Sequence, residues 1–285
     1  MRKLKIPLEE KSVKDIFLDC IENLQDKDAL QQCADMIQED TKDYRTLAPL
    51  QLADFHYHTE FPGGVTAARL MEVYSNTFVS RKRFYNKILF PDGLTECPIC
   101  DTGELSTLDH YLPKSVVPTL AVTPCNLVPM CSDCNKIKLD RMETEPGRMP
   151  FHLYFDDFSD EPWLEVRLVL GEELAALYEV RCPAGDPVRM ERMQRHLELY
   201  KLKDRFRNKA SGEMSRSRKY WCRKLAARGE KGLRLDLQDK RISEEEVDPN
   251  SWRSALYRGL EQNVDLLIRW LEAGQTANLS LVEAG

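Results

Sequence analysis

This chain has little that would place it in a membrane or in an oxidising compartment. Its 285 residues contain no apolar run of the eighteen or more residues that a membrane-spanning helix needs. The first residues, MRKLKIPLEEKS, lack the apolar core of a signal peptide. Nine cysteines are an odd number, which suits a reducing compartment better than a disulfide framework. We therefore expect a soluble, cytoplasmic protein that does not associate with membranes.

Two further features are missing. The sequence has no internal repeats, and it contains no Gly-x-x-x-x-Gly-Lys-Ser/Thr loop of the kind that holds nucleotide phosphates. Any P-loop ATPase that works with this protein would have to be a different chain. At 42% hydrophobic residues, the chain can bury an ordinary core in one large or two small domains.

Two Cys-x-x-Cys pairs stand out among the features that are present. The first pair is Cys97 and Cys100, and the second is Cys131 and Cys134. Four thiolates in two such pairs match the tetrahedral, sulfur-rich shell of structural zinc. The thirty residues between the pairs exceed the spacing of about 15 to 20 in a plain zinc ribbon, so a further segment has been inserted. The alternative interpretations of these four cysteines are unrelated buried thiols or a redox pair. We interpret Cys125, just outside the second pair, as a small buried residue.

The inserted segment carries side chains suited to phosphodiester hydrolysis. LDHYLPKS contains Asp109 and His110, PCNLVPMC contains Asn126, and Asn135 follows the last cysteine directly. Hydrolysis needs a base for the attacking water and a cation for the charge that grows on the phosphoryl group. His110 offers an imidazole that titrates near neutral pH. Asp109 and Asn135 offer the hard oxygen ligands that Mg²⁺ or Mn²⁺ accepts.

Taken together, these residues resemble the HNH motif of the ββα-metal, or His-Me finger, endonucleases. The likeness covers roughly residues 95–140 and includes the four-cysteine zinc knuckle found in many members. It implies that His110 is the general base and that Asn126 braces the loop that orients the imidazole. It also implies that Asp109 and Asn135 hold a catalytic Mg²⁺ or Mn²⁺. The third motif residue is Asn135 here rather than histidine, and an amide oxygen favours Mg²⁺ or Mn²⁺ over zinc.

Several other residues have both a functional and a structural interpretation. Lys136 and Lys138 are expected in the first turn after the last cysteine, where they either meet phosphate or, more commonly for surface lysines, are solvated. His56 and His58 lack a third ligand nearby, so we interpret them as structural. His152 stands among aromatic residues and is more often packed than a ligand.

The positive charge of the chain is concentrated in one segment. The net charge is −6, yet Asp186 to Leu235 holds sixteen Lys and Arg against six acidic residues, a net +10, which leaves −16 elsewhere. Such asymmetry is what a phosphate-binding face on an acidic protein would show. A solvated helix face or a surface that docks on an acidic partner would show it as well.

The apolar patterns predict an α+β, mostly helical protein with three regions. Residues 1–92 are expected to be helical and 159–285 to form a hairpin and basic helices, while the resemblance implies that 93–158 form the HNH core with its zinc knuckle. Ser12 and Thr66 are candidate N-caps, and a second helix is expected over 28–37. WLEVRLVL and LAALYEVR alternate as strands of a hairpin. A last helix is expected from Asn250 or Ser251 to a stop at Gly274.

These observations predict a metal-dependent HNH endonuclease that cuts DNA, with double-stranded DNA as the expected substrate. Family members with this layout include restriction-type and anti-phage defence nucleases that work with a separate ATPase, and the resemblance implies a protein of that kind. A zinc-knuckle module that binds nucleic acid without cutting it is one alternative. A scaffold that docks on an acidic partner is the other.

Overall fold

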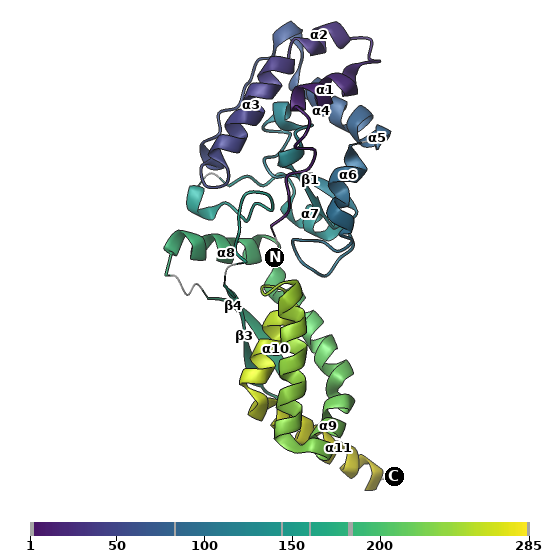
Figure 1. Cartoon of the computed structure of the whole chain (residues 1–285), viewed down its shortest axis with the longest axis vertical. Helices are drawn as coiled ribbons and strands as arrows, with labels where there is room; N and C mark the ends of the chain where they lie inside the picture. The colour runs from purple at the N-terminus through teal and green to yellow at the C-terminus, as the bar shows by residue number, and fades with distance from the viewer. Residues whose placement is uncertain (1–2, 83, 144, 160, 182–184, 284–285) are drawn as a thin grey trace. The chain divides into compact units, whose positions relative to one another are not determined.

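The computed structural model describes residues 3–82, 84–143, 145–159, 161–181 and 185–283. The protein is α+β and mostly helical, with two-stranded antiparallel sheets, so the expected fold class is confirmed at this level. The chain divides into two compact units. We call residues 3–157 with 191–200 the cysteine unit, and residues 158–190 with those from 201 onward the hairpin unit (Figure 1).

These units cut the chain differently from the three regions expected from the sequence. Residues 1–92 and 93–158, expected as separate regions, both fall mainly within the cysteine unit. The chain returns to the cysteine unit after the hairpin, because residues 191–200, which include most of helix α8 (Pro187–Leu199), pack there. Arg192 on α8 is buried and bonds to the Met149 and Pro150 carbonyls and to the Asp156 carboxylate.

The cysteine unit consists of short helices around a small sheet. Its α-helices, π-helical turn and strands are α1 (Val13–Ile21), α2 (Lys27–Gln31), α3 (Ala34–Leu47), α4 (Ala67–Val73), η3 (Tyr74–Phe78, the π-helical turn), α5 (Val79–Arg81), α6 (Tyr85–Leu89), β1 (Thr107–His110), β2 (Leu127–Met130) and α7 (Ser132–Lys138). Single 3-10 turns are η1 (Leu52–Asp54), η2 (Pro62–Gly64), η4 (Pro91–Gly93), η5 (Pro118–Leu120), η6 (Pro124–Asn126) and η7 (Pro146–Arg148).

Two helices of this unit begin at the caps that the sequence indicates. Ser12 Oγ accepts a hydrogen bond from the Asp15 backbone N–H at 3.0 Å, and Thr66 Oγ1 accepts one from the Arg69 N–H at 3.2 Å. The second expected helix is broken, because α2 ends at Gln31 and α3 begins three residues later. The prediction of one continuous helix over 28–37 was therefore wrong.

Strands β1 and β2 pair antiparallel and lead directly into a helix. Thr107 lies opposite Met130, and His110 lies opposite Leu127. A single residue, Cys131, separates β2 from α7 and is the N-cap of that helix. β1, β2 and α7 therefore make a strand-strand-helix arrangement, and the loop from residue 111 to 126 joins the two strands.

The hairpin unit packs helices against a second sheet. Its elements are β3 (Leu164–Leu170), β4 (Leu174–Val180), the first residues of α8, α9 (Leu202–Val247), α10 (Trp252–Gln262) and α11 (Val264–Glu283). β3 and β4 form the expected antiparallel hairpin, with Leu164 opposite Val180. Alternate side chains of both strands are buried, as period-2 patterning requires. Gly259 allows α10 to approach β3, because a Cβ there would lie 3.0 Å from Val166.

Helix α9 is two helices joined at a glycine. Gly229 has φ 64° and ψ −171°, which is not helical, and only glycine adopts such a conformation readily. Tyr220 Oη donates to Asp236 at 2.5 Å, and Lys224 Nζ lies 3.1 Å from the same carboxylate. Residues 12 to 16 apart in sequence can meet in this way only if the chain folds back. We call residues 202–228 the first arm and residues 230–247 the second arm.

The C-terminal helical stripe is interrupted. Ser251 caps α10 by accepting from the Ser254 N–H, as the sequence indicates, but α10 ends at Gln262 and α11 begins at Val264. α11 continues to Glu283, so the stop expected at Gly274 is wrong. Of the helices in the described part of the chain, none combines the length and the apolar character that crossing a bilayer requires.

Candidate functional site

The four cysteines of the two Cys-x-x-Cys pairs form one buried cluster. Their Sγ atoms all lie within 4.8 Å of one another. Cys97 Sγ is 3.9 Å from Cys134 Sγ, and Cys100 Sγ is 3.8 Å from Cys131 Sγ. Four sulfurs bound tetrahedrally at about 2.3 Å from one ion are about 3.8 Å apart, whereas a disulfide brings two sulfurs to about 2.05 Å. The cluster could therefore hold a structural metal such as zinc, and its thiols are not paired as disulfides.

Local backbone structure presents these sulfurs to one another. The Asp101 N–H donates to the Cys97 carbonyl at 2.8 Å, and the Cys97 N–H donates to the Gly103 carbonyl at 2.7 Å, which closes a tight turn. Gly103 is needed because a Cβ there would lie 2.9 Å from the Cys131 Cβ. At the start of α7, Cys131 Sγ accepts from the Cys134 N–H at 3.5 Å. The short turn and the helix N-terminus each present two sulfurs.

His110, at the end of β1, is held in a defined tautomer. Its Nε2 lies 2.9 Å from the Ala121 carbonyl oxygen in the loop between β1 and β2. A carbonyl oxygen can only accept, so Nε2 carries the proton and Nδ1 of the neutral ring is the acceptor. The Tyr74 ring packs edge-on against the imidazole, with the centroids 4.6 Å apart. The ring is therefore oriented by one hydrogen bond and one aromatic contact.

The surroundings of His110 favour the neutral ring. The pKa of His110 is lowered to about 3, chiefly by burial and also by the nearby Lys114 and Lys138 cations, while the hydrogen bond to Ala121 opposes the shift. Transfer of a charged imidazolium into a buried site is unfavourable, which accounts for the direction. At neutral pH the imidazole is therefore unprotonated, and its pKa lies below the near-neutral value expected from the sequence, which makes it a weaker base than a solvated histidine.

Asn126 holds both ends of the loop that carries Ala121. Its Oδ1 accepts from the Leu112 N–H at 2.8 Å, and its Nδ2 donates to the Leu112 and Leu120 carbonyls at 3.1 and 3.3 Å. The side chain is fully buried, and all of these partners are backbone groups. Asn126 therefore shapes the loop from within and is not placed to contact a ligand.

Asp109 precedes His110 on β1 and is paired with a buried cation. Lys138 Nζ lies 2.7 Å from Asp109 Oδ2 and donates to the His110 carbonyl oxygen at 2.7 Å. Burial raises the pKa of the Asp109 carboxyl above its usual range, and the attraction of Lys138 opposes that rise. The sequence-based expectation put Lys138 in the first turn of a helix as a surface residue. The seven-residue helix α7 instead ends at Lys138, which is 2% exposed.

Asn135 lies on the face of α7 that carries Lys138. The two residues are three apart, and such pairs share one side of a helix. Since Lys138 reaches Asp109 on β1, Asn135 is on the side of α7 that faces the same strand. Lys136 is exposed on another face of α7, which agrees with its interpretation from the sequence as a solvated surface lysine.

Helix α3 braces the loop between β1 and β2 from outside. Asp40 Oδ2 accepts from Thr119 Oγ1 at 2.5 Å, and Thr41 Oγ1 lies 3.0 Å from Thr123 Oγ1. These four side chains are buried. Ala121, which bonds to His110, lies between the two braced threonines. Sequence reasoning missed these residues because the pairs are about 80 positions apart and no short motif connects them.

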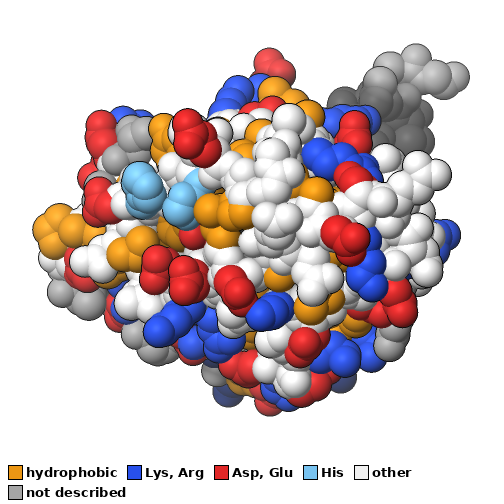
Figure 2. Space-filling view, turned by 90° about the horizontal axis from the view of Figure 1, so that it is seen from above, with side chains coloured by type: hydrophobic (Ala, Val, Ile, Leu, Met, Phe, Trp, Pro, Cys, Tyr) orange, Lys and Arg blue, Asp and Glu red, His pale blue; other side chains and the backbone are white. Residues whose placement is uncertain are grey.

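His58 and His152 make contacts within the fold of the cysteine unit. Figure 2 shows histidine side chains lying together on the surface, and of the described histidines His56 is exposed and His58 is half-buried. His58 Nε2 lies 3.0 Å from Asp40 Oδ1, so the pair does not form a metal site of its own. His152 is fully buried and bonds to Tyr44 Oη at 2.7 Å, which confirms the packed interpretation.

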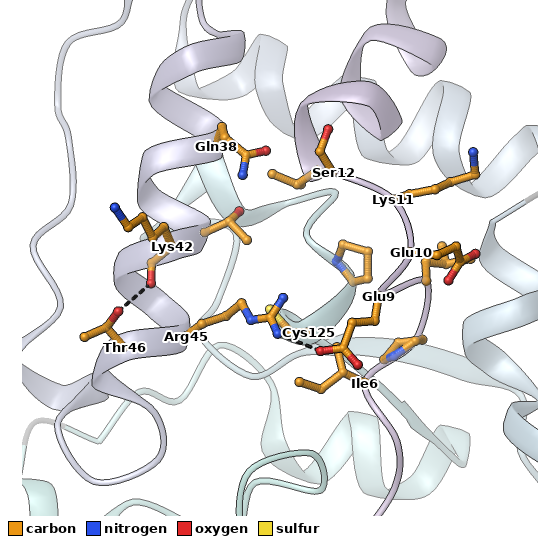
Figure 3. Close-up of a pocket in the computed structure, with 15 residues that line it drawn as sticks. Ile6, Glu9, Glu10, Lys11, Ser12, Gln38, Lys42, Arg45, Thr46 and Cys125 are labelled. Atoms are coloured by element: carbon orange, nitrogen blue, oxygen red, sulfur yellow. Dashed lines mark hydrogen bonds and ion pairs between the residues drawn. The ribbon is translucent and has the colours of Figure 1, made fainter.

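A cavity of about 460 Å³ lies beside α3 but does not reach the catalytic candidates. The segment before α1, one side of α3 and the Pro124–Cys125 turn line it. Figure 3 shows Arg45 extending from α3 to Glu9, where the two side chains form an ion pair of 2.8 Å. Neither Asp109 nor His110 lines this cavity. Cys125 is buried at its base and stands apart from the four-cysteine cluster.

Comparison with known proteins gives one similarity over most of the chain. The chain is 27% identical over 224 residues to a protein of Escherichia phage lambda described as "Protein ea31". The aligned part is 71% of this chain and 75% of the phage protein. No protein-family model matches the chain. No solved structure matches it.

Proposed function

We propose that this protein is a metal-dependent endonuclease of the HNH type that hydrolyses phosphodiester bonds in DNA. The observation that carries the proposal is the state of His110. Its Nε2 donates to the Ala121 carbonyl, which leaves Nδ1 as the acceptor of the ring, on the residue that follows Asp109 in β1 of the strand-strand-helix element. Water activation on a phosphate held by a bound cation needs a neutral, oriented imidazole and an oxygen ligand for the cation, and β1 carries both residue types in succession.

In this proposal, His110 Nδ1 takes the proton of the water that attacks the scissile phosphorus. The Ala121 carbonyl keeps the accepting nitrogen in place during the transfer, because the imidazolium that forms retains its Nε2–H bond. Asn126 and the two braces from α3 keep Ala121 in place. A mechanism with a fixed base therefore explains why a short loop carries so many buried hydrogen bonds.

Asp109 and Asn135 are the residues that would hold the catalytic cation. Their donor set is a carboxylate and an amide oxygen, which matches Mg²⁺ or Mn²⁺ and not a thiophilic metal. When bound, such an ion supplies Lewis-acid stabilisation of the charge on the phosphoryl group and the leaving oxygen. Lys138 Nζ lies 2.7 Å from Oδ2 of the Asp109 carboxylate, and its charge offsets the cost of burying that carboxylate.

We also propose that the four-cysteine cluster holds zinc in a structural role. All four sulfurs are buried, so no position is open for a substrate, and closed sites with four thiolate ligands are structural. The second Cys-x-x-Cys pair caps α7, the helix that carries Asn135 and Lys138. Zinc would therefore fix the helix that completes the catalytic site.

A cleavage assay separates this proposal from a non-cutting binding module. Purified protein is incubated with supercoiled plasmid and Mg²⁺ or Mn²⁺, with and without EDTA. The proposal expects metal-dependent nicking or linearisation that His110→Ala reduces about 10² to 10⁴-fold, the usual contribution of a positioned base. His56→Ala is the matched control, because this histidine is exposed and remote from β1 in sequence. Equal cleavage by His110→Ala and wild type, or no cleavage by wild type in either metal with or without a partner ATPase and ATP, would contradict the nuclease proposal.

The place of such an activity in a cell is a further part of the proposal. The family resemblance favours a restriction-type or anti-phage defence nuclease that works with a separate ATPase. Plasmid cleavage that appears only when an ATPase chain and ATP are added would support that part. Cleavage by the chain alone would leave the partner unnecessary for the chemistry.

A further inference from the structure

The first arm of α9 concentrates the positive charge of the hairpin unit. It carries ten Lys and Arg residues and two acidic residues, a net charge of +8. The second arm carries four basic and six acidic residues, a net charge of −2. The net charge therefore changes from positive to negative at Gly229, where the helix folds back. The broad basic segment that the sequence indicates is, in the structure, essentially one helix.

Some basic residues of the first arm have partners inside the unit. Arg218 donates to the Trp270 carbonyl at 2.7 Å and stacks over the Trp270 ring. Lys224 pairs with Asp236 of the second arm at 3.1 Å. Arg207 pairs with Asp204 one turn away. These contacts stabilise the packing of the hairpin unit or neutralise charge locally.

Four other basic residues form a separate stripe. At 3.6 residues per turn, Lys209, Arg216, Lys219 and Arg223 fall within a sector of roughly 80° of the helix surface. All four are exposed, and the side chain of Arg216 is 73% exposed although it pairs with Glu213 at 3.2 Å. Within the described residues, Lys209, Lys219 and Arg223 have no ion pair. We call these four residues the basic stripe.

The basic stripe faces away from the core of its unit. The buried residues of the first arm are centred roughly 120° around the helix from the stripe: Leu202, Phe206, Ala210, Met214 and Trp221. Neither acidic residue of the arm lies in the sector of the stripe. Four like charges along about 21 Å of helix repel one another, and a polyanion would relieve that repulsion. A solvated face would be expected to carry both signs, as the second arm does.

We infer that the basic stripe binds the sugar-phosphate backbone of double-stranded DNA. A length of about 21 Å spans about six phosphates of one strand, since each strand carries one charge per roughly 3.4 Å. Contacts from lysine and arginine to phosphates do not read base sequence, so the stripe would hold DNA without selecting a site. This inference takes DNA as the ligand from the proposed function but does not require that the protein cut it.

Fluorescence anisotropy with a labelled duplex of about 25 base pairs tests the inference, with EDTA present so that no cleavage occurs. The test variant carries Lys209→Gln, Arg216→Gln, Lys219→Gln and Arg223→Gln. The matched control carries Lys203→Gln, Arg207→Gln, Arg228→Gln and Lys231→Gln, which removes the same charge from exposed positions outside the stripe. Thermal unfolding confirms that both variants are folded. Binding is measured between about 50 and 200 mM salt, the range over which phosphate contacts weaken strongly.

The stripe variant should lose at least about tenfold in affinity at about 100 mM salt. The slope of its plot of log affinity against log salt concentration should become less negative by about 0.9 for each lost phosphate contact, and by up to about 3.6 for four. The control should stay within about twofold of wild type. Equal affinity and slope for wild type and stripe variant would overturn the inference, even if the wild type cuts plasmid. Failure of wild type to bind duplex would also overturn it.

The outcomes for the two proposals are distinguishable. Stripe-dependent binding without plasmid cleavage would support the basic stripe and refute the nuclease. If wild type cleaves plasmid but the stripe variant binds duplex DNA as tightly as wild type, the nuclease proposal is supported and the inference about the basic stripe is refuted.

Discussion

Replacement of Lys138 by methionine tests how the candidate site is held together. Methionine is similar in length but carries no charge, so Lys138→Met removes the ammonium and little volume. The Asp109 carboxylate then stays 12% exposed without the cation that lies 2.7 Å from Oδ2. The His110 carbonyl oxygen also loses its 2.7 Å donor. The substitution thus leaves a largely buried charge and a buried acceptor without partners.

The expected loss of stability follows from these two contacts. Removal of one partner of a buried ion pair costs about 3 to 5 kcal/mol, and the lower end applies because Asp109 retains some contact with water. A buried carbonyl that loses its donor adds about 1 kcal/mol. For the cysteine unit, a loss of about 4 kcal/mol corresponds to a melting temperature roughly 10 °C lower. Lys136→Met is the matched control, because Lys136 is exposed on the same helix and should shift stability by less than about 0.5 kcal/mol.

The loss should depend on pH. Burial raises the pKa of Asp109 in the folded protein above its value in the unfolded chain. Between these two pKa values the folded protein binds more protons than the unfolded chain. The free energy of unfolding therefore falls as pH rises through this range. Without Lys138, the pKa of Asp109 rises further and the range widens upward. The difference in urea unfolding between Lys138→Met and wild type should therefore grow as pH is raised through the pKa of Asp109 in the folded variant.

A second substitution supplies the decisive control. Adding Asp109→Asn to Lys138→Met removes the uncompensated charge, so the double variant should regain about 2 kcal/mol relative to the single variant. If Lys138→Met stays within about 1 kcal/mol of wild type at about pH 8, or if Asp109→Asn makes it less stable still, the ion pair does not stabilise the site as described.

Three further predictions address the metal, the base and its support. Elemental analysis of protein purified without chelators should find about one zinc per chain, and Cys97→Ser should lower zinc content and melting temperature together, because a metal held by four thiolates contributes folding free energy; zinc-free wild type would refute this. Asp109→Ala should abolish plasmid cleavage but regain some activity as Mn²⁺ is raised, whereas His110→Ala should regain none; equal rescue of both would mean that His110 is not the base. Asp40→Ala, which removes the partner of Thr119, should lower cleavage at saturating Mg²⁺ without changing zinc content or duplex affinity, and an unchanged rate would show that the loop needs no brace from α3.

The sequence by itself determined the features that depend on neighbouring residues. The spacing within each Cys-x-x-Cys pair places two sulfurs on one turn, so the cluster of four could be predicted from the sequence. Ser12 and Thr66 cap helices because a hydroxyl reaches a backbone N–H three residues on. The alternation in WLEVRLVL and LAALYEVR identified β3 and β4, since period-2 patterning reflects the pleat of a single strand.

Some helix boundaries depended on more than periodicity. The break between α2 and α3 and the one between α10 and α11 interrupt continuous apolar stripes. The fold-back at Gly229 was missed too, although the two glycines of RGEKG could have signalled it. An apolar stripe records which face is buried, and it stays the same whether one helix or two bury that face.

Only the tertiary structure decided the environment of the candidate site. Lys138 reads as a surface lysine in the sequence, and it is buried because β1 brings Asp109 and the His110 carbonyl within reach of its ammonium. Asp40 reads as one of many acidic residues on a polar helix, yet it bonds to Thr119, 79 positions away. Local propensity carries no information on such contacts, because they exist only once the core has placed distant segments together. The sequence determined which chemical groups are present, and the fold determined which of them are buried, charged and oriented.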